Sequence, residues 1–157
     1  MIASSSSKAI FEQILKHHSF ANDTNVDQLS KHTCFICIHD TITNEEPYFK
    51  KDHPNVLNLW FDDVEFEISD LKGQKAVPMS PEQAQQILAF LNSNKNNGVK
   101  ECMIHCTAGV SRSVAVRHFI DMYFSSANRV VLNLLLNEYQ KELRNDILIP
   151  NGEGVKK

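Results

Sequence analysis

The stretch His105-Cys106-Thr107-Ala108-Gly109-Val110-Ser111-Arg112-Ser113, together with the segments on either side of it, gives the clearest prediction of the fold. The segment before it, residues 99–105, is short and partly apolar and follows Asn97-Gly98, which predicts a buried strand after a turn. The segment after it, residues 113–124, contains neither Gly nor Pro and is mostly apolar, which predicts a buried helix. The quoted stretch therefore contains a tight loop that joins a strand to a helix.

A loop in this position is suited to an anion. The backbone N–H groups of residues 107–112 can turn inward, and the unpaired amides and positive dipole end of the helix face the same point. Cys106 begins the loop, so the same field would stabilise its thiolate and lower its pKa below the ~8.5 of a free cysteine. Because the thiolate is the nucleophilic form, Cys106 is the predicted nucleophile.

The remaining loop residues suit a phosphoryl group. Arg112 can bind two phosphoryl oxygens through its planar guanidinium and can bind them more strongly as charge develops in the transition state. Gly109 allows a positive φ or a close approach of the backbone. Ser113 can donate a hydrogen bond to the sulfur, which helps the sulfur leave when a phosphoenzyme is hydrolysed. The predicted phosphate cradle consists of Thr107, Ala108, Gly109, Val110, Ser111 and Arg112.

This combination of residues resembles a known superfamily. A Cys five residues before an Arg is by itself more typical of a buried cysteine near a helix start. With the preceding His, the Gly and the final Ser, the motif resembles the protein tyrosine phosphatase superfamily, and residues 108–113 are similar to its small dual-specificity branch. The segment 144–151 also resembles the Ile-x-Pro-Asn ending of that branch. The resemblance extends from about Thr33 to Asn151 and implies a cysteine-dependent phosphatase.

A cysteine nucleophile needs a proton donor for the leaving oxygen. The resemblance implies an Asp on an upstream loop, and the apolar run 56–61 is followed by Asp62 and Asp63, where a strand would end. Trp60-Phe61-Asp62 is also similar to the Trp-Pro-Asp of the larger tyrosine phosphatases. Asp62 is therefore the predicted acid, and Asp63 is the second choice.

The spacing to the nucleophile keeps a third acid open. Asp62 lies further from Cys106 than the family's usual interval of roughly thirty to thirty-five residues, and Asp70 fits that interval better. Residues 64–68 alternate between apolar and acidic, which predicts an extra edge strand or an ordered excursion inserted before Asp70. A surface insertion is tolerated thermodynamically, so spacing alone does not decide between these aspartates.

Two other features concern the surroundings of the nucleophile. His105, next to it on the predicted strand, is expected to support the loop by hydrogen bonding to the backbone. Cys34 and Cys37 would point to opposite faces of a strand, and no second Cys or His pair completes a zinc site, so core packing is predicted for both. No metal and no cofactor are expected.

The whole pattern predicts an α/β fold with a single three-layer domain. Strands are predicted at 33–38 and 56–61, and helices at 8–18, from Pro81 after the N-cap Ser80, and at about 128–143. Strands that alternate with helices favour a mainly parallel central sheet flanked by helices, with the ligand beyond the carboxyl ends of the strands. The resemblance implies that this is the protein tyrosine phosphatase fold. We expect residues 1–7 to be a flexible N-terminus, residues 8–151 to be the phosphatase domain and residues 152–157 to be a short polar tail.

Composition narrows the class of protein. With 42% apolar and 22% charged residues the chain resembles ordinary soluble domains. Its first residues lack a basic and an apolar signal region, no stretch is long enough to span a bilayer, and four cysteines with one predicted thiolate indicate a reducing cytoplasm. The net charge of −3 gives no broad attraction to nucleic acid or to an acidic membrane.

The predicted function is a protein phosphatase that hydrolyses phosphotyrosine, with phosphoserine and phosphothreonine as further substrates, through a cysteinyl-phosphate intermediate. Its predicted partner is a phosphorylated protein or peptide. Arg112 is the only fixed cation of the loop, whereas the superfamily's phosphoinositide phosphatases usually have lysines there. The alternatives are an RNA 5′-phosphatase, a catalytically weak phosphopeptide-binding domain and, as a weaker third choice, a sulfurtransferase or arsenate reductase.

Overall fold

The structure, a computed structural model, describes residues 1–17, 23, 31–43, 45–69 and 73–124, together with residues 131, 134, 135, 137 and 138. The contacts between residues divide the chain into two units, Met1–Ser125 and Ser126–Lys157. Every helix and strand named below belongs to the first unit. The helix predicted at about 128–143 lies mostly outside the described residues, and the predicted tail and the segment 144–151 lie wholly outside them.

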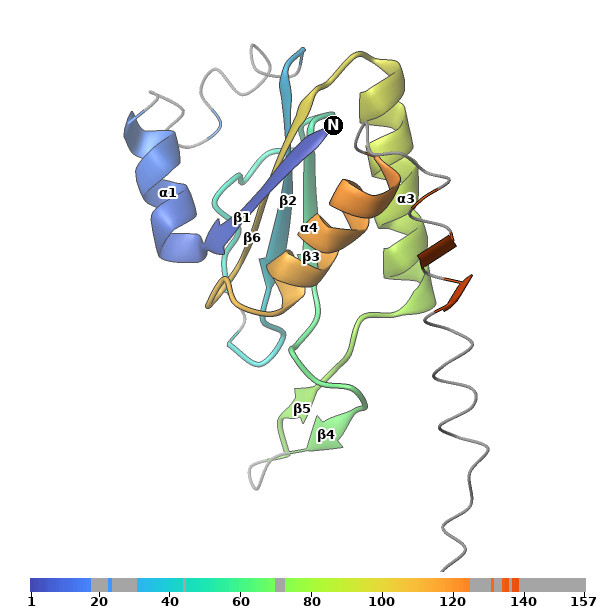
Figure 1. Ribbon diagram of the computed structural model, residues 1–157. Helices are drawn as coiled ribbons and strands as arrows, with labels where there is room; N and C mark the ends of the chain where they lie inside the picture. Colours follow the sequence, from blue (N-terminus) through green and yellow to red (C-terminus); the bar gives the residue numbers. More distant parts are fainter. Residues whose placement is uncertain are drawn as a thin grey trace, which may run out of the picture. The chain divides into compact units, whose positions relative to one another are not determined.

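The first unit is built on a parallel sheet with the strand order β1-β6-β2-β3 (Figure 1). These strands are β1 (Ile2–Ser7), β2 (Thr33–His39), β3 (Val56–Trp60) and β6 (Glu101–Cys106). All residues of β2 are buried, because β2 has a strand on each side and helices or loops over both faces. The strands predicted at 33–38, 56–61 and 99–105 are confirmed as β2, β3 and β6.

Helices cover both faces of this sheet. On one face, Phe11 and Leu15 of α1 (Lys8–His17) pack against Phe35 and Cys37 of β2. On the other face lie α3 (Pro81–Asn96) and α4 (Arg112–Tyr123). The described part of the chain is thus an α/β fold with a parallel sheet between helices.

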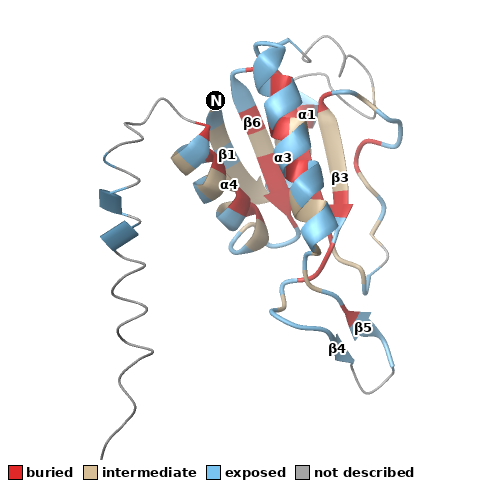
Figure 2. Ribbon diagram, turned by 90° about the vertical axis from the view of Figure 1, so that its right-hand side faces the viewer, coloured by how far each residue is buried: buried red, intermediate tan, exposed pale blue. Residues whose placement is uncertain are grey.

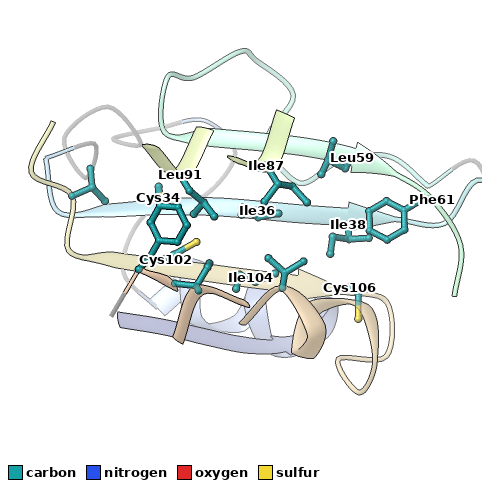
Figure 3. Packing of buried hydrophobic residues seen from close by; sticks show 14 residues of the cluster. Cys34, Ile36, Ile38, Leu59, Phe61, Ile87, Leu91, Cys102, Ile104 and Cys106 are labelled. Atoms are coloured by element: carbon teal, nitrogen blue, oxygen red, sulfur yellow. The ribbon is translucent and has the colours of Figure 1, made fainter. Parts of the chain in front are cut away.

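The larger of the two cores lies beneath α3 and α4, and Figure 3 shows its packing. Ile87 and Leu91 of α3 and Ile120 of α4 are buried in the same cluster as Cys34 of β2. Cys34 and Cys37 therefore belong to different cores, which confirms that they point to opposite faces of the strand.

The N-terminal segment corrects one expectation. Residues 1–7 were expected to be flexible, but Ile2–Ser7 form β1, which pairs with β6 in parallel from Ile2 opposite Glu101 to Ser7 opposite Cys106. The expectation is wrong because sheet pairing uses backbone N–H and C=O groups, which serine supplies as well as any other residue. A run of small polar side chains gives no sign of that pairing in the sequence.

The segment between β3 and α3 contains a short antiparallel hairpin, β4 (Ile68–Ser69) and β5 (Lys75–Ala76), separate from the main sheet. The alternation at 64–68 predicted an edge strand or an ordered excursion, and the structure has the excursion. Figure 1 shows the hairpin beyond the edge of the sheet at which β3 and β6 end.

The start of α3 agrees with its sequence signals. The Gln83 N–H donates to the Ser80 hydroxyl oxygen at 3.2 Å, and the Ser80 N–H donates to the Gln83 side chain at 2.9 Å. The Gln83 amide also donates to the Trp60 carbonyl at 2.8 Å, which links α3 to the end of β3. Within the described ranges, the helices are all too short or too polar to cross a bilayer.

Candidate active site

Residues 105–113, the motif with which the sequence analysis begins, lie at the edge of the sheet where the parallel strands have their carboxyl ends. Cys106 is the last residue of β6, and α4 begins at Arg112 after a five-residue loop, which we call the anion loop (residues 107–111). Since β2, β3 and β6 run parallel, the residues that follow β2 and β3 reach the same edge. Cys106 and Phe61 lie at this end of the larger core in Figure 3.

The Cys106 sulfur is surrounded by hydrogen-bond donors. The side chain is buried, the Gly109 N–H donates to Sγ at 3.2 Å, and the Ser113 Oγ lies 3.2 Å from Sγ. Burial raises the pKa of the Cys106 thiol, but the hydroxyl and N–H of Ser113, the N–H of Gly109 and the charge of Arg112 outweigh it, so the pKa is lowered overall. This environment favours the thiolate.

Arg112 is fixed on two sides and free on the third. Its Nη1 donates to the Phe61 carbonyl at 2.7 Å, and its Nη2 lies 2.5 Å from the Asp40 carboxylate. Its Nε is buried and has no hydrogen-bond partner among the described residues. An unpartnered donor on a side chain that is only 9% exposed indicates a site for an acceptor that the described residues do not provide.

The start of α4 leaves its amides available. Ser111 occupies the N-cap position, but its side chain does not cap the helix, and the first turn contains no acidic residue. Instead the Ser111 hydroxyl donates to the Asp63 carboxylate at 2.7 Å. The helix end and the Arg112 guanidinium therefore present positive potential at the same place.

Gly109 packs against the first strand. Its φ is +77°, and a Cβ at this position would overlap the backbone of Ser6 and Ser7. The need for glycine is thus twofold, since β1 leaves no room and the left-handed conformation disfavours other residues. The exposed loop residues Thr107, Ala108 and Val110 carry no such restriction.

Asp62 is buried within a set of donors. One carboxylate oxygen accepts from the Thr41 N–H at 3.0 Å, and the other accepts from the Thr41 hydroxyl and from the Val77 N–H at 2.8 Å. Burial raises the pKa of Asp62, but these hydrogen bonds and Arg112 outweigh it and lower the pKa overall. Asp63 is exposed and contacts Ser111, and Asp70 lies outside the described residues.

Asp40 is a site residue that the sequence analysis missed. It follows β2 directly, and its carboxylate accepts from the Thr107 hydroxyl at 2.9 Å as well as pairing with Arg112. Asp40 therefore connects the first residue of the anion loop to Arg112, the first residue of α4. The available signal was its position just after a predicted strand, at the edge where the ligand was expected.

His105 lies behind the loop and is completely buried. Its ring centroid lies 4.4 Å from that of Phe11 and 5.5 Å from that of His39. Burial, with a smaller effect of His39, lowers the pKa of His105 to about 3, so the ring is neutral at pH 7. Its predicted hydrogen bonding to the loop backbone stays a prediction.

A cavity of about 390 Å³ opens beside Arg112. Its walls include Asp63 and Arg112 and are otherwise mostly apolar, with Phe61, Met79, Leu88 and Phe119 among them. Apolar surroundings lower the local dielectric constant and thereby strengthen the interaction of a guanidinium with an anion.

The described residues contain no group of three or more His, Cys, Asp or Glu side chains placed to hold a metal ion. Comparison of the chain with models of protein families, with curated proteins and with solved structures finds no match.

Proposed function

We propose that this chain is a cysteine-dependent protein phosphatase with the fold of the protein tyrosine phosphatase superfamily. One observation carries the proposal. The Cys106 sulfur, whose pKa is lowered, shares a short loop with Arg112, whose buried Nε has no partner among the described residues. A phosphoryl group bound at the loop would supply the missing acceptor and present its phosphorus to the thiolate.

The first step forms a sulfur–phosphorus bond. The Cys106 thiolate attacks phosphorus, and the bond from phosphorus to the leaving oxygen breaks. Arg112 and the amides at the start of α4 stabilise the charge on the phosphoryl oxygens. The leaving oxygen takes a proton from a carboxylic acid, because an unprotonated alkoxide or phenoxide leaves slowly at neutral pH.

We propose Asp63 as this acid in preference to Asp62. The lowered pKa of Asp62 keeps its carboxylate ionised, and its hydrogen bonds to Thr41 and Val77 leave both oxygens engaged. Asp63 is exposed, borders the cavity beside Arg112 and contacts the anion loop through Ser111. Asp62 then has the supporting role of fixing the backbone from which Asp63 extends.

The second step hydrolyses the cysteinyl phosphate. Water attacks phosphorus and gives a proton to the Asp63 carboxylate, the sulfur–phosphorus bond breaks, and inorganic phosphate leaves. The returning thiolate accepts a hydrogen bond from Ser113, whose oxygen is 3.2 Å from Sγ. Both steps use only side chains of this chain and water.

We propose a phosphorylated protein as the substrate, with phosphotyrosine first and phosphoserine and phosphothreonine as further substrates. Arg112 is the only Lys or Arg between Cys106 and Ser113, and it is paired with Asp40, which suits a single phosphate better than a polyanion. A thiolate enzyme requires a reducing compartment, so the cytoplasm is the proposed location.

The test is hydrolysis of an aryl phosphate by the purified protein and three variants. Cys106→Ser should abolish turnover and still bind phosphate, and Asp63→Asn should lower kcat by roughly a hundredfold. Asp62→Asn is the matched comparison and should lower kcat less than Asp63→Asn. Unchanged activity in Cys106→Ser would overturn the proposed function.

The pH profile separates the two aspartates. If Asp63 donates the proton, the fall of kcat at high pH should disappear in Asp63→Asn and persist in Asp62→Asn. The reverse result would return the acid to Asp62. A wild-type protein that binds vanadate but does not hydrolyse the aryl phosphate would instead indicate a phosphopeptide-binding domain.

A further inference from the structure

The hairpin segment, of which the structure describes residues 63–69 and 73–77, is joined by hydrogen bonds to the edge of the sheet that carries the anion loop. The Asp62 N–H donates to the Val77 carbonyl at 2.7 Å, and the Val77 N–H donates to the Asp62 carboxylate at 2.8 Å. These two bonds close the base of the hairpin segment. Its first residue, Asp63, contacts Ser111 of the anion loop, so the segment begins at the rim of the site.

The hairpin segment exposes large apolar side chains. Phe66 is 68% exposed and Ile68 is 45% exposed, and neither belongs to a core cluster. Figure 2 shows β4 as exposed. Ala76 of β5 is buried. An exposed phenylalanine on a segment that begins at a candidate site is typical of a surface that binds a partner.

The same segment carries exposed acidic side chains. Asp63, Glu65 and Glu67 are all exposed. Glu67 forms an ion pair with Lys75 at 2.7 Å, whereas Glu65 has no ion pair among the residues that the structure describes. Around this edge the described acidic residues, which are Asp40, Glu45, Asp62, Asp63, Glu65 and Glu67, outnumber the basic residues Lys8, Lys75 and Arg112.

We propose that Glu65 and Phe66 bind the peptide that flanks the phosphorylated residue, and that they select substrates with a Lys or Arg and an apolar side chain close to it. An extended peptide advances about 3.3 Å per residue. Asp63 contacts the anion loop through Ser111, and Glu65 and Phe66 follow Asp63 in the chain, so a peptide that extends from the loop along the hairpin segment would meet them. The excess of acidic side chains at this edge should also repel nucleic acids, because their further phosphate groups would extend beyond the anion loop.

This inference rests on the proposed function, and the test separates the two. The substrates are an aryl phosphate, which has no flanking residues for Glu65 and Phe66 to bind, and three phosphotyrosine peptides that differ only in Lys, Gln or Glu at the flanking positions. The protein should hydrolyse the Lys peptide with a kcat/KM about three to five times that of the Gln peptide, as for one exposed ion pair. The preference should shrink in high salt, since the Debye length falls from about 10 Å at 0.1 M to about 3 Å at 1 M.

Glu65→Lys is the main variant, and Asp52→Lys is its control because Asp52 is an exposed acid that precedes β3, at the opposite end of the sheet. Glu65→Lys should reverse the order of the Lys and Glu peptides, and Asp52→Lys should leave the order unchanged. Phe66→Ser should raise KM for all three peptides. In every variant the rate on aryl phosphate should equal that of the wild type.

Two results would overturn the inference while the proposed function stands. These are a normal aryl phosphate rate with no preference among the peptides, and a preference that Glu65→Lys does not change. Faster hydrolysis of a 5′-phosphorylated RNA oligonucleotide than of the Lys peptide would overturn both the inference and the proposed protein substrate. Absence of aryl phosphate hydrolysis would contradict the proposed function itself.

Discussion

Asp40 acts on both ends of the anion loop through a single carboxylate. One oxygen accepts from the Thr107 hydroxyl and the other pairs with Arg112, while the Phe61 carbonyl holds the guanidinium from another side. A guanidinium fixed in this way loses little conformational entropy when an anion binds. Asp40 is therefore a positioning residue in the proposed phosphatase.

Replacing Asp40 with Ala should weaken vanadate binding by about tenfold or more, because a hydrogen bond to a charged group contributes about 1.5–3 kcal/mol. Asp40→Asn should have a smaller effect, since its amide oxygen can still accept from Arg112. Inhibition constants for vanadate in the aryl phosphate assay measure both. Asp52→Ala is the control, and equal vanadate binding in Asp40→Ala and wild type would contradict the role of Asp40.

Gly109→Ala should lower both stability and activity. The left-handed conformation costs an alanine about 1 kcal/mol, and the methyl group would in addition overlap the backbone of Ser6 and Ser7. Gly98→Ala is a matched control, because Gly98 has a φ of +84° but none of the described residues places an atom within 4 Å of its Cβ position. Urea unfolding should show a loss in both variants, and Gly109→Ala alone should lose aryl phosphate activity.

The sequence predicts the helices and strands whose own side chains form an apolar run or a helix cap. The apolar runs of β2, β3 and β6 and the capping box of α3 are local signals, and each is confirmed. β1 could not be predicted, because its serines bury little and its stability comes from backbone pairing with β6. The contact of Asp40 with Arg112 could not be predicted either, because it depends on the alignment of β2 and β6, which are far apart in the sequence.

Thr41→Val should loosen the hairpin segment. The variant removes the hydroxyl that donates to Asp62, so the pKa of Asp62 should rise and the Val77 N–H should exchange faster with solvent. Carboxyl titration and amide exchange by NMR measure both effects. A Val77 N–H that exchanges as slowly as in the wild type would show that Asp62 does not close the hairpin segment.

Two buried histidines, one of them packed against Phe11 of the smaller core, make the stability of the protein depend on pH. His39 and His105 are both fully buried, and burial lowers the pKa of each, that of His105 to about 3. The ordinary histidine pKa is 6.5, so between about pH 3 and pH 6.5 the unfolded chain binds more protons than the folded chain. Stability is therefore complete above about pH 6.5 and decreases as the pH falls below it.

Urea unfolding should detect this loss. Between about pH 7.5 and pH 5, His105 alone should lower the free energy of unfolding by about 2 kcal/mol, because each pKa unit corresponds to about 1.36 kcal/mol. His105→Asn should reduce the difference between the two pH values, and replacement of the exposed His118 by Asn should not. Equal stability of the wild type at both pH values would contradict the neutral state of the buried rings.

The position of β1 behind the anion loop has a consequence for how mutations in the serine tract should behave. The atoms nearest to a Cβ at position 109 are main-chain atoms of Ser6 and Ser7, so this packing does not depend on the Ser6 side chain. Ser6→Ala should therefore be silent, whereas Ser7→Ala should destabilise the start of α1, because the Ser7 hydroxyl accepts from the Ile10 N–H at 3.4 Å. Proline at either position, which lacks the N–H and restricts φ, should displace β1 and disturb the anion loop. The serine tract of β1, whose side chains give no signal in the sequence, thus helps to determine the shape of the anion loop.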